Sequence, residues 1–306
     1  MENIYDLAIL GAGPAGICAA IYATRAKLNT IWLDKKFVQG GQIVDTYEVD
    51  NYPGLPGITG LDLGEAMAGH AEKLGMKPQR EQVRSIEAEQ GIKVIRTKKN
   101  EYRARAVIIA CGATHRHLGI PGEEELSGMG VSYCATCDAA FFQDRTVVVV
   151  GGGNVAVEDA ILLSRTCKKV YLVHRRDELR AEKILQECLF ACKNVELIWD
   201  SIPLSIEGTD KVEALKIQNK KTQEESFIET DGVFIAVGIV PGTEKFKDLV
   251  KLDEAGYIVA GEDGITSEPG IFAAGDIRTK NLRQVVTAVA DGANAVASAQ
   301  RYLLDK

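Results

Sequence analysis

The sequence has no long apolar run and no excess of basic residues. None of its apolar stretches approaches the roughly 18 residues that suggest a membrane span. No basic segment followed by an apolar run precedes the first predicted strand, so no signal peptide is expected. The formal net charge of -7 argues against nucleic acid as the main partner, because phosphate binding favours a basic face. We therefore expect a cytoplasmic protein that binds neither membrane nor nucleic acid.

The sequence also lacks a paired framework of cysteines. Its seven cysteines are odd in number and scattered over 306 residues, unlike the disulfide frameworks of small secreted proteins. Most of them are expected to be buried, reduced thiols that pack as small hydrophobic side chains. Only Cys134 and Cys137 have a spacing that suggests chemistry.

A strand, a glycine-rich turn and a helix are predicted twice in the chain. The apolar run 6–10 leads into GAGPAG at 11–16, and the apolar run 146–150 leads into GGGNVA at 151–156. Each is the opening of a βαβ unit. The two turns are too far apart to belong to one unit, so two dinucleotide-binding domains are predicted.

Both domains are expected to contain a parallel sheet and an antiparallel β insertion. Short strand candidates broken by turns occupy residues 83–110 and again 211–236. After the second domain come a strand at 271–273 and a helical pattern from Asn281 to about Leu304. The predicted fold is therefore α/β, with two nested Rossmann-like domains.

The nesting gives a discontinuous first domain, at 1–114 and 244–306, and a second domain at 115–243. Segments 118–122 and 238–242 contain proline and glycine and are the predicted crossings between the domains. Two crossings would make a double hinge.

The first glycine-rich turn predicts a dinucleotide site. Its glycines let the backbone approach a pyrophosphate at the positive end of the following helix, where Pro14 is tolerated. Asp34 ends the next strand, where an acid accepts from a ribose hydroxyl. A plain tight turn would explain the glycines alone, but not this combination.

A second anchor for the same ligand is predicted at Gly275 and Asp276, although Asp276 could instead cap a helix. Paired with the N-terminal turn, this anchor favours FAD, whose ribityl chain needs a partner beyond the pyrophosphate. A helix beginning near Arg283 and Gln284 would point its positive end at the flavin.

The second turn predicts NADPH rather than NADH. The strand at 169–173 ends in His174, Arg175 and Arg176, followed by Arg180. An acid there would repel a 2′-phosphate, whereas arginines hold one through forked charged hydrogen bonds. The alternative is a solvated, basic start of a helix.

The pair Cys134 and Cys137 is interpreted as a redox disulfide. A Cys-x-x-Cys loop is easily reduced and re-formed, and a helix N-terminus would lower the pKa of one thiol. Asp138 is placed to move protons during thiol exchange. A zinc half-site would need two further ligands, for which Cys188 and Cys192 are the candidates. Two simply buried cysteines are the other alternative, but two nucleotide sites supply a source of electrons.

Over essentially its whole length the chain resembles the low-molecular-weight, bacterial-type thioredoxin reductases. The matching motifs, in order, are GAGPAG at 11–16, GGQ at 40–42, NYPG at 51–54, CATCD at 134–138, GGGNVA at 151–156, HRRDELRA at 174–181, and Asp276 with Arg283 and Gln284.

The resemblance implies a homodimer that passes electrons from NADPH through FAD to the disulfide, and then to thioredoxin or a thioredoxin-like dithiol protein. It implies that Cys137 faces the flavin, that Cys134 attacks the substrate disulfide and that Asp138 is the acid/base. Because the disulfide and the nicotinamide must reach the same flavin, it also implies rotation of one domain against the other.

The resemblance assigns two sets of cofactor-binding residues. The FAD set is Gly11, Gly13, Pro14, Ala15, Gly16, Asp34, Lys35, Gly40, Gly41, Gln42, Asn51, Val83, Gly112, Gly275, Asp276, Arg283, Gln284 and Val285. The NADPH set is Gly151, Gly153, Asn154, Val155, Ala156, His174, Arg175, Arg176 and Arg180.

Two positions depart from the family pattern. Val155 replaces a common serine, which removes a hydroxyl contact to NADPH. Ala139 replaces a common glycine, which implies that this position needs no positive φ or is slightly strained.

Two other functions fit parts of the sequence. A flavin dithiol oxidase or ferredoxin-linked disulfide reductase shares the scaffold but characteristically lacks the arginines of the second site. A non-enzymatic nucleotide sensor would not explain Cys134, Cys137 and Asp138 together.

Overall fold

The computed structural model describes residues 4–46, 49 and 51–305, which fold as two compact units. Unit 1 contains Met1–Thr114 and Val240–Lys306, and unit 2 contains His115–Ile239. The chain thus leaves unit 2 at 239/240, slightly before the predicted boundary at 243/244.

The strands at the two passages are β7 (Ala113–His115) and β16 (Ile239–Pro241), which pair with each other. Segment 118–122, predicted as a crossing, lies inside unit 2. Its Gly122 has a φ of +84°, and a Cβ there would lie 1.9 Å from the carbonyl oxygen of Ile206. The glycine therefore serves a tight turn packed on a neighbouring strand, which is a different use from a hinge.

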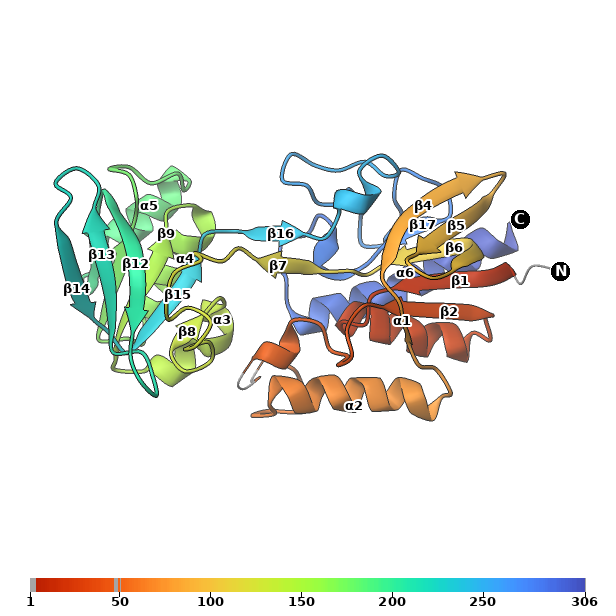
Figure 1. Ribbon diagram of the computed structural model, residues 1–306, viewed down its shortest axis with the longest axis horizontal. Coiled ribbons are helices and arrows are strands. Elements are labelled where there is room, and N and C mark those ends of the chain that lie inside the picture. The colour runs from red at the N-terminus through yellow and green to blue at the C-terminus, as the bar shows by residue number, and fades with distance from the viewer. Residues whose placement is uncertain (1–3, 47–48, 50, 306) are drawn as a thin grey trace. The chain divides into compact units, whose positions relative to one another are not determined.

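Unit 1 is built on a seven-stranded sheet (Figure 1) in the order β3-β2-β1-β6-β5-β4, with β17 also paired to β6. Strand β6 carries parallel β1 along one edge, while its other edge is shared by antiparallel β5 and parallel β17. The strands are β1 (Ile4–Leu10), β2 (Thr30–Asp34), β3 (Gln79–Arg80), β4 (Val83–Glu89), β5 (Ile92–Thr97), β6 (Glu101–Ile109) and β17 (Ile271–Ala273).

Alternate residues of β1 belong to two different cores. Leu7 and Ile9 pack with the helices, and Ala8 and Leu10 pack with the opposite core. This two-sided burial explains why the strand is a continuous apolar run. The helices are α1 (Pro14–Arg25), α2 (Gly60–Lys73) and α6 (Val285–Leu304), with the short helices η1 (Ile43–Asp45), η3 (Glu244–Phe246) and η4 (Gly275–Ile277).

Unit 2 contains a five-stranded parallel sheet in the order β11-β10-β9-β15-β8 and a separate antiparallel sheet β12-β13-β14. One core lies between the parallel sheet and the helices, and a second lies between the two sheets. The strands are β8 (Val131–Ser132), β9 (Thr146–Gly151), β10 (Lys169–Val173), β11 (Val195–Ile198), β12 (Ser201–Glu207), β13 (Ala214–Asn219), β14 (Glu225–Glu229) and β15 (Gly232–Ala236), and the helices are α3 (Ala135–Asp138), η2 (Ala139–Phe142), α4 (Asn154–Ser164) and α5 (Lys183–Phe190).

The α/β class with parallel sheets is confirmed, but two details of the prediction are wrong. Strand Gly232–Ala236 pairs in parallel with β9 and β8 and is not part of the antiparallel insertion. Its residues are almost all buried, as expected for a strand covered on both faces. The last helix begins at Val285 and not at Asn281, in agreement with the start predicted near Arg283 and Gln284, because Gln284 caps it reciprocally with Thr287.

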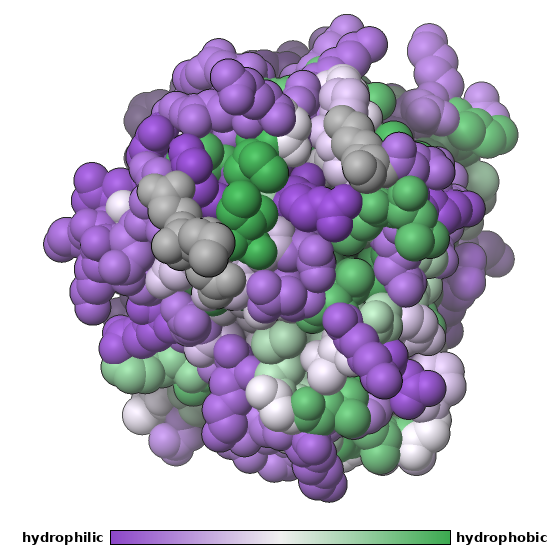
Figure 2. Space-filling model, turned by 90° about the vertical axis from the view of Figure 1, so that its right-hand side faces the viewer, coloured by the Kyte–Doolittle hydropathy of each residue, from purple (hydrophilic) through white to green (hydrophobic). Residues whose placement is uncertain are grey.

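Among the described residues, no helix is both long and apolar enough to cross a membrane. The face shown in Figure 2 is mainly hydrophilic, with apolar side chains in small separate groups.

Candidate functional site

The first glycine-rich turn joins β1 to α1 and requires glycine for steric reasons. A Cβ on Gly11 would lie 2.3 Å from the carbonyl oxygen of Ala110, and one on Gly16 would lie 1.9 Å from the carbonyl oxygen of Gly11. The indole Nε1 of Trp32 donates to Gly11 O over 2.9 Å. Gly13 and Pro14 begin the helix. The turn is thus held rigidly, with the free N–H groups of the helix start available to an anion.

The neighbouring predicted residues gather around this turn. Gly40 N donates to Ala12 O over 2.7 Å, and a Cβ on Gly41 would lie 3.1 Å from Gly13 Cα. Gln42 follows at the start of η1. At the end of β2, burial raises the pKa of Asp34, although hydrogen bonds from the Lys35 and Lys36 backbone oppose the shift. The structure therefore brings segment 40–42 onto the turn.

The C-terminal part of the chain contributes to the same unit. Asn51 Nδ2 donates to Gln284 Oε1 over 3.0 Å, so two predicted residues far apart in the sequence are in contact. Asp276 Oδ1 and Arg283 Nε are buried without a hydrogen-bond partner in the part of the chain that the structure describes. Burial also raises the pKa of Asp276. Buried polar atoms left unpaired in this way call for an explanation, and a bound polar ligand is one.

The remaining predicted residues of unit 1 lie at ends of its elements. Val83 begins β4, and its carbonyl oxygen accepts from Lys245 Nζ over 2.7 Å. Gly112 follows β6 with a φ of +67°. Val285 is the first residue of α6.

A buried ion cluster between α6 and the segment that contains Asp276 was not predicted from the sequence. The carboxylate of Asp291, on α6, accepts hydrogen bonds from Arg278 and Lys280 and from the backbone N–H of Gly275. The cluster connects α6 to η4, which carries Asp276. The available signal was Asp291 itself, the single acidic residue of an Ala-rich helix.

The second glycine-rich turn joins β9 to α4. A Cβ on Gly151 would lie 2.5 Å from both Ala236 O and the Ala156 side chain, so close packing of helix and strand leaves no room for it. Asn154 Oδ1 accepts from Glu182 N over 2.9 Å. Val155, in the first turn of α4, has a side chain 55% exposed. The departure from serine thus places an apolar group on the surface beside the turn.

The four basic residues predicted to bind NADPH differ in their exposure to solvent. Arg175, Arg176 and Arg180 are exposed, whereas His174 is 4% exposed. A Cβ on Gly152 would lie 2.2 Å from the His174 ring, so the ring lies directly against the turn. Burial lowers the pKa of His174, which favours the neutral ring. Its position suits support of the turn, while the arginines are available to a ligand.

Cys134 and Cys137 are joined by a disulfide, with their Cα atoms 5.3 Å apart. Cys134 caps α3, and its Sγ accepts from Cys137 N over 3.2 Å. Ala139 has a φ of −53°, so the prediction that this position needs no positive φ is confirmed. Among the described residues, no cluster of three or more metal-ligating side chains occurs.

Asp138 ends α3, one residue after the disulfide. Its Oδ2 accepts from Ser132 Oγ over 2.5 Å, and its Oδ1 is buried with no partner among the described side chains and backbone groups. Burial raises the pKa of Asp138, and the Ser132 hydrogen bond opposes the shift. A carboxyl whose pKa is raised holds its proton more readily and can exchange it with a nearby thiol.

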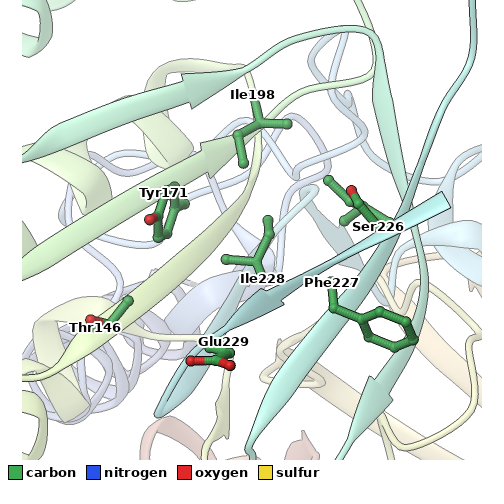
Figure 3. A pocket seen from close by; sticks show the side chains of 8 residues that line it. Thr146, Tyr171, Ile198, Ser226, Phe227, Ile228 and Glu229 are labelled. Atoms are coloured by element: carbon green, nitrogen blue, oxygen red, sulfur yellow. The ribbon is translucent and has the colours of Figure 1, made fainter. Parts of the chain in front are cut away.

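A groove of about 490 Å³ lies elsewhere in unit 2, between the parallel and antiparallel sheets (Figure 3). Tyr171 and Ile198 line one side, and Ser226 to Glu229 of β14 line the other. Its lining contains neither a cysteine nor a residue of the glycine-rich turn, so it is separate from the predicted site.

The fold, the two glycine-rich turns and the disulfide define a class of protein. The chain belongs to the pyridine nucleotide-disulphide oxidoreductase family, whose model matches residues 5–292. It is 48% identical over 303 residues to the thioredoxin reductase of Listeria innocua, covering 99% of this chain and 95% of that protein. It is equally 48% identical over 310 residues to the thioredoxin reductase of Peptoclostridium acidaminophilum, covering 99% of this chain and 98% of the relative.

The crystal structure of thioredoxin reductase from Streptococcus pyogenes matches the whole of both chains at 45% identity with a TM-score of 0.95. The resemblance inferred from the sequence motifs is therefore confirmed.

Proposed function

We propose that this chain is an NADPH-dependent thioredoxin reductase. FAD binds unit 1, NADPH binds unit 2, and the Cys134–Cys137 disulfide passes electrons to thioredoxin or a thioredoxin-like dithiol protein. The proposal rests on the disulfide between Cys134 and Cys137, which lies beside the buried carboxyl of Asp138. The same unit contains the second glycine-rich turn. The high identity to relatives named thioredoxin reductase supports it.

The residues of unit 1 fit FAD. The glycine-rich turn and the start of α1 suit a pyrophosphate, and Asp34 suits a ribose hydroxyl. Asp276 Oδ1, which lacks a partner in the described structure, suits a further hydroxyl of the ligand. When bound, FAD supplies two-electron transfer between a nicotinamide and a disulfide.

The residues of unit 2 fit NADPH. Gly153 and the start of α4 form the second pyrophosphate site, and the exposed guanidinium groups of Arg175, Arg176 and Arg180 suit a 2′-phosphate. The hydroxyl that serine would offer is absent at Val155, so we expect the arginines to carry a larger share of the affinity.

The cysteines then exchange disulfides with the protein substrate. In the reduced chain, the Cys134 thiolate attacks the substrate disulfide and forms a mixed disulfide, releasing one substrate thiolate. Cys137 then attacks Cys134 Sγ, which releases the second substrate thiolate and re-forms the disulfide. Asp138 exchanges a proton at its carboxyl as thiols and thiolates interconvert. Each cycle consumes two electrons and two protons per substrate disulfide.

A homodimer, which the family resemblance implies, and a cytoplasmic location, which is expected from the sequence, complete the proposal. Rotation of one unit against the other, at the two passages of the chain, is proposed from the same resemblance.

A flavin dithiol oxidase or ferredoxin-linked reductase on this scaffold is the alternative. The three exposed arginines beside the second turn argue against it, because an enzyme that does not bind NADPH has no need to hold a 2′-phosphate. A nucleotide sensor without enzymatic activity would leave the disulfide and Asp138 without a role.

One assay separates these functions. The purified flavoprotein is mixed with NADPH or NADH, each with thioredoxin, alone, or with oxygen only. We expect rapid NADPH oxidation that depends on thioredoxin. Bleaching of the flavin by neither nucleotide would overturn the proposal, and oxidation driven by oxygen alone would favour the oxidase.

A further inference from the structure

Ser132 connects the disulfide-bearing loop to Asp138. Its side chain is 5% exposed, and its Oγ donates to Asp138 Oδ2 over 2.5 Å. The same Oγ accepts from the backbone N–H of Cys134 over 3.1 Å. One hydroxyl therefore binds both the carboxyl and the backbone of the first cysteine.

Ser132 is held on a strand and not on a flexible loop. It belongs to β8, which pairs in parallel with β15 through the register Ser132–Phe234. Phe234 is 1% exposed, so the strand that supports Ser132 is part of the core. A side chain placed by a packed strand holds its partner more exactly than one placed by a loop.

The carboxyl of Asp138 depends on this single hydroxyl. Its other oxygen has no partner among the described residues. Helix α4, which contacts α3, carries Glu158 and Asp159, but burial and the Ser132 hydrogen bond are the two causes of the pKa shift at Asp138. The cysteines on the same short helix are bonded to each other and do not titrate.

We propose that Ser132 is a positioning residue for disulfide exchange, which holds the Asp138 carboxyl beside the Cys134–Cys137 pair and stabilises its ionised form. The inference rests on the proposed function, because it assumes that Asp138 moves protons. Without the hydroxyl, Oδ2 loses its hydrogen bond and neither carboxyl oxygen has a partner among the described residues, which favours the neutral acid. The bond joins a hydroxyl to a charged group, and its loss is expected to shift the ionisation of Asp138 upward by about one pH unit, or about tenfold in its acid constant.

The test compares Ser132→Ala with a matched pair, Ser132→Thr and Ser132→Val, in the FAD-loaded protein. Threonine and valine have nearly the same volume and differ by a hydroxyl. The ionisation of Asp138 is followed by infrared titration of its carboxyl band. Asp138→Asn identifies that band, and Asp159→Asn removes a second carboxyl whose pKa burial raises to about 7.

We expect Ser132→Ala and Ser132→Val to raise the ionisation pH of Asp138 by about one unit, and Ser132→Thr to leave it close to the wild-type value. If Ser132→Ala does not retain FAD, the threonine and valine pair gives the answer. An unchanged ionisation in Ser132→Val, or an equal shift in Ser132→Thr, would overturn the proposal.

A second measurement follows turnover with thioredoxin against pH. The limb of the kcat profile that Asp138→Asn abolishes should move upward by about one unit in Ser132→Val, while KM for thioredoxin stays within about twofold of wild type, because the hydroxyl acts on the proton and not on docking. A rise in KM without a moved limb would overturn the positioning role. If wild-type protein does not reduce thioredoxin, the proposed function fails, but the infrared titration still decides whether Ser132 holds Asp138.

Discussion

Asp291 and Arg278 form a buried, two-pronged ion pair in unit 1. Arg278 Nε and Nη2 donate to the two carboxylate oxygens of Asp291 over 2.9 and 2.7 Å, and both side chains are 3% exposed. Asp291 Oδ2 also accepts from the backbone of Gly275. The pair therefore determines where Asp276, the next residue, lies relative to α6.

Asp291→Ala is expected to lower the free energy of unfolding of unit 1 by about 3–5 kcal/mol. It leaves the buried guanidinium of Arg278 with only the exposed carboxylate of Glu262, 3.7 Å away, as an ionic partner. Urea unfolding followed by the fluorescence of Trp32, in a Trp199→Phe background, reports on this unit. As a control, Glu244→Ala breaks the exposed pair with Lys247 and should cost no more than about 1 kcal/mol. Equal losses in the two variants would contradict the role given to the buried pair.

Gly16→Ala is expected to abolish FAD retention, because the added Cβ would collide with the carbonyl oxygen of Gly11 and displace the turn. The ratio of flavin to protein absorbance measures this. Gly69→Ala, in α2, is the matched control, since a Cβ there meets no described atom within 4 Å. That variant should keep its flavin and gain up to about 1 kcal/mol of helix stability. Full flavin content in Gly16→Ala would show that the turn is not the binding site.

Arg176→Ala is expected to lower kcat/KM for NADPH by about 10–100-fold, because the variant loses charged hydrogen bonds to the 2′-phosphate. The value for NADH should change little. Steady-state kinetics with both nucleotides measure the preference. Arg165→Ala removes an exposed arginine at the opposite end of α4 and should leave the preference unchanged. A uniform loss with NADPH and NADH would instead indicate a general electrostatic role.

Cys134→Ser is expected to leave the Cys137 thiolate beside the flavin and to produce a long-wavelength charge-transfer band in the absorption spectrum. Cys137→Ser should not. Both variants should lose thioredoxin reduction, which separates loss of activity from the spectroscopic difference. A band in Cys137→Ser alone would reverse the roles of the two sulfurs.

Asp138→Asn is expected to stabilise the oxidised protein at neutral pH while impairing turnover. Burial raises the pKa of Asp138 in the folded state, so the unfolded chain ionises first as the pH rises. Ionisation of the unfolded chain lowers stability progressively from pH 3.8 upward, until the folded carboxyl is also ionised. The stability gained by the amide should therefore be largest above the folded pKa and fade toward pH 3.8. Unfolding midpoints between pH 5 and 8 measure it, and a gain that falls with rising pH would contradict this sign.

The repeated elements were predictable because their signals are local. A strand, a glycine-rich turn and a helix lie within about 20 consecutive residues, and Asp34 follows at a characteristic distance. The Cys-x-x-Cys spacing and Asp138 are likewise contiguous. To predict a phosphate site at the arginines after β10, only the position of the preceding strand was needed.

Predictions failed where a local sequence pattern fits more than one structure. Segment 118–122 was predicted as a crossing, but the backbone freedom of its Gly122 serves a turn packed on β12. Strand Gly232–Ala236 could not be assigned to one sheet or the other from its apolar run alone. The helical pattern of the sequence extends back to Asn281, but the side chains of Gln284 and Thr287 cap the helix and set its start at Val285.

Residues close together in the chain were enough to predict the α/β class, the two glycine-rich turns and the cysteine pair with its neighbouring acid. All of these depend on residues close together in the chain, for which spacing sets geometry. The contacts between distant groups appear only in the folded structure: Asn51 with Gln284, Asp291 with Arg278, and His174 against Gly152. These contacts depend on how sheets and helices pack, and packing is set by the shape of whole surfaces. The same holds for Ser132, because strand pairing and the start of α3 together bring its hydroxyl to Asp138.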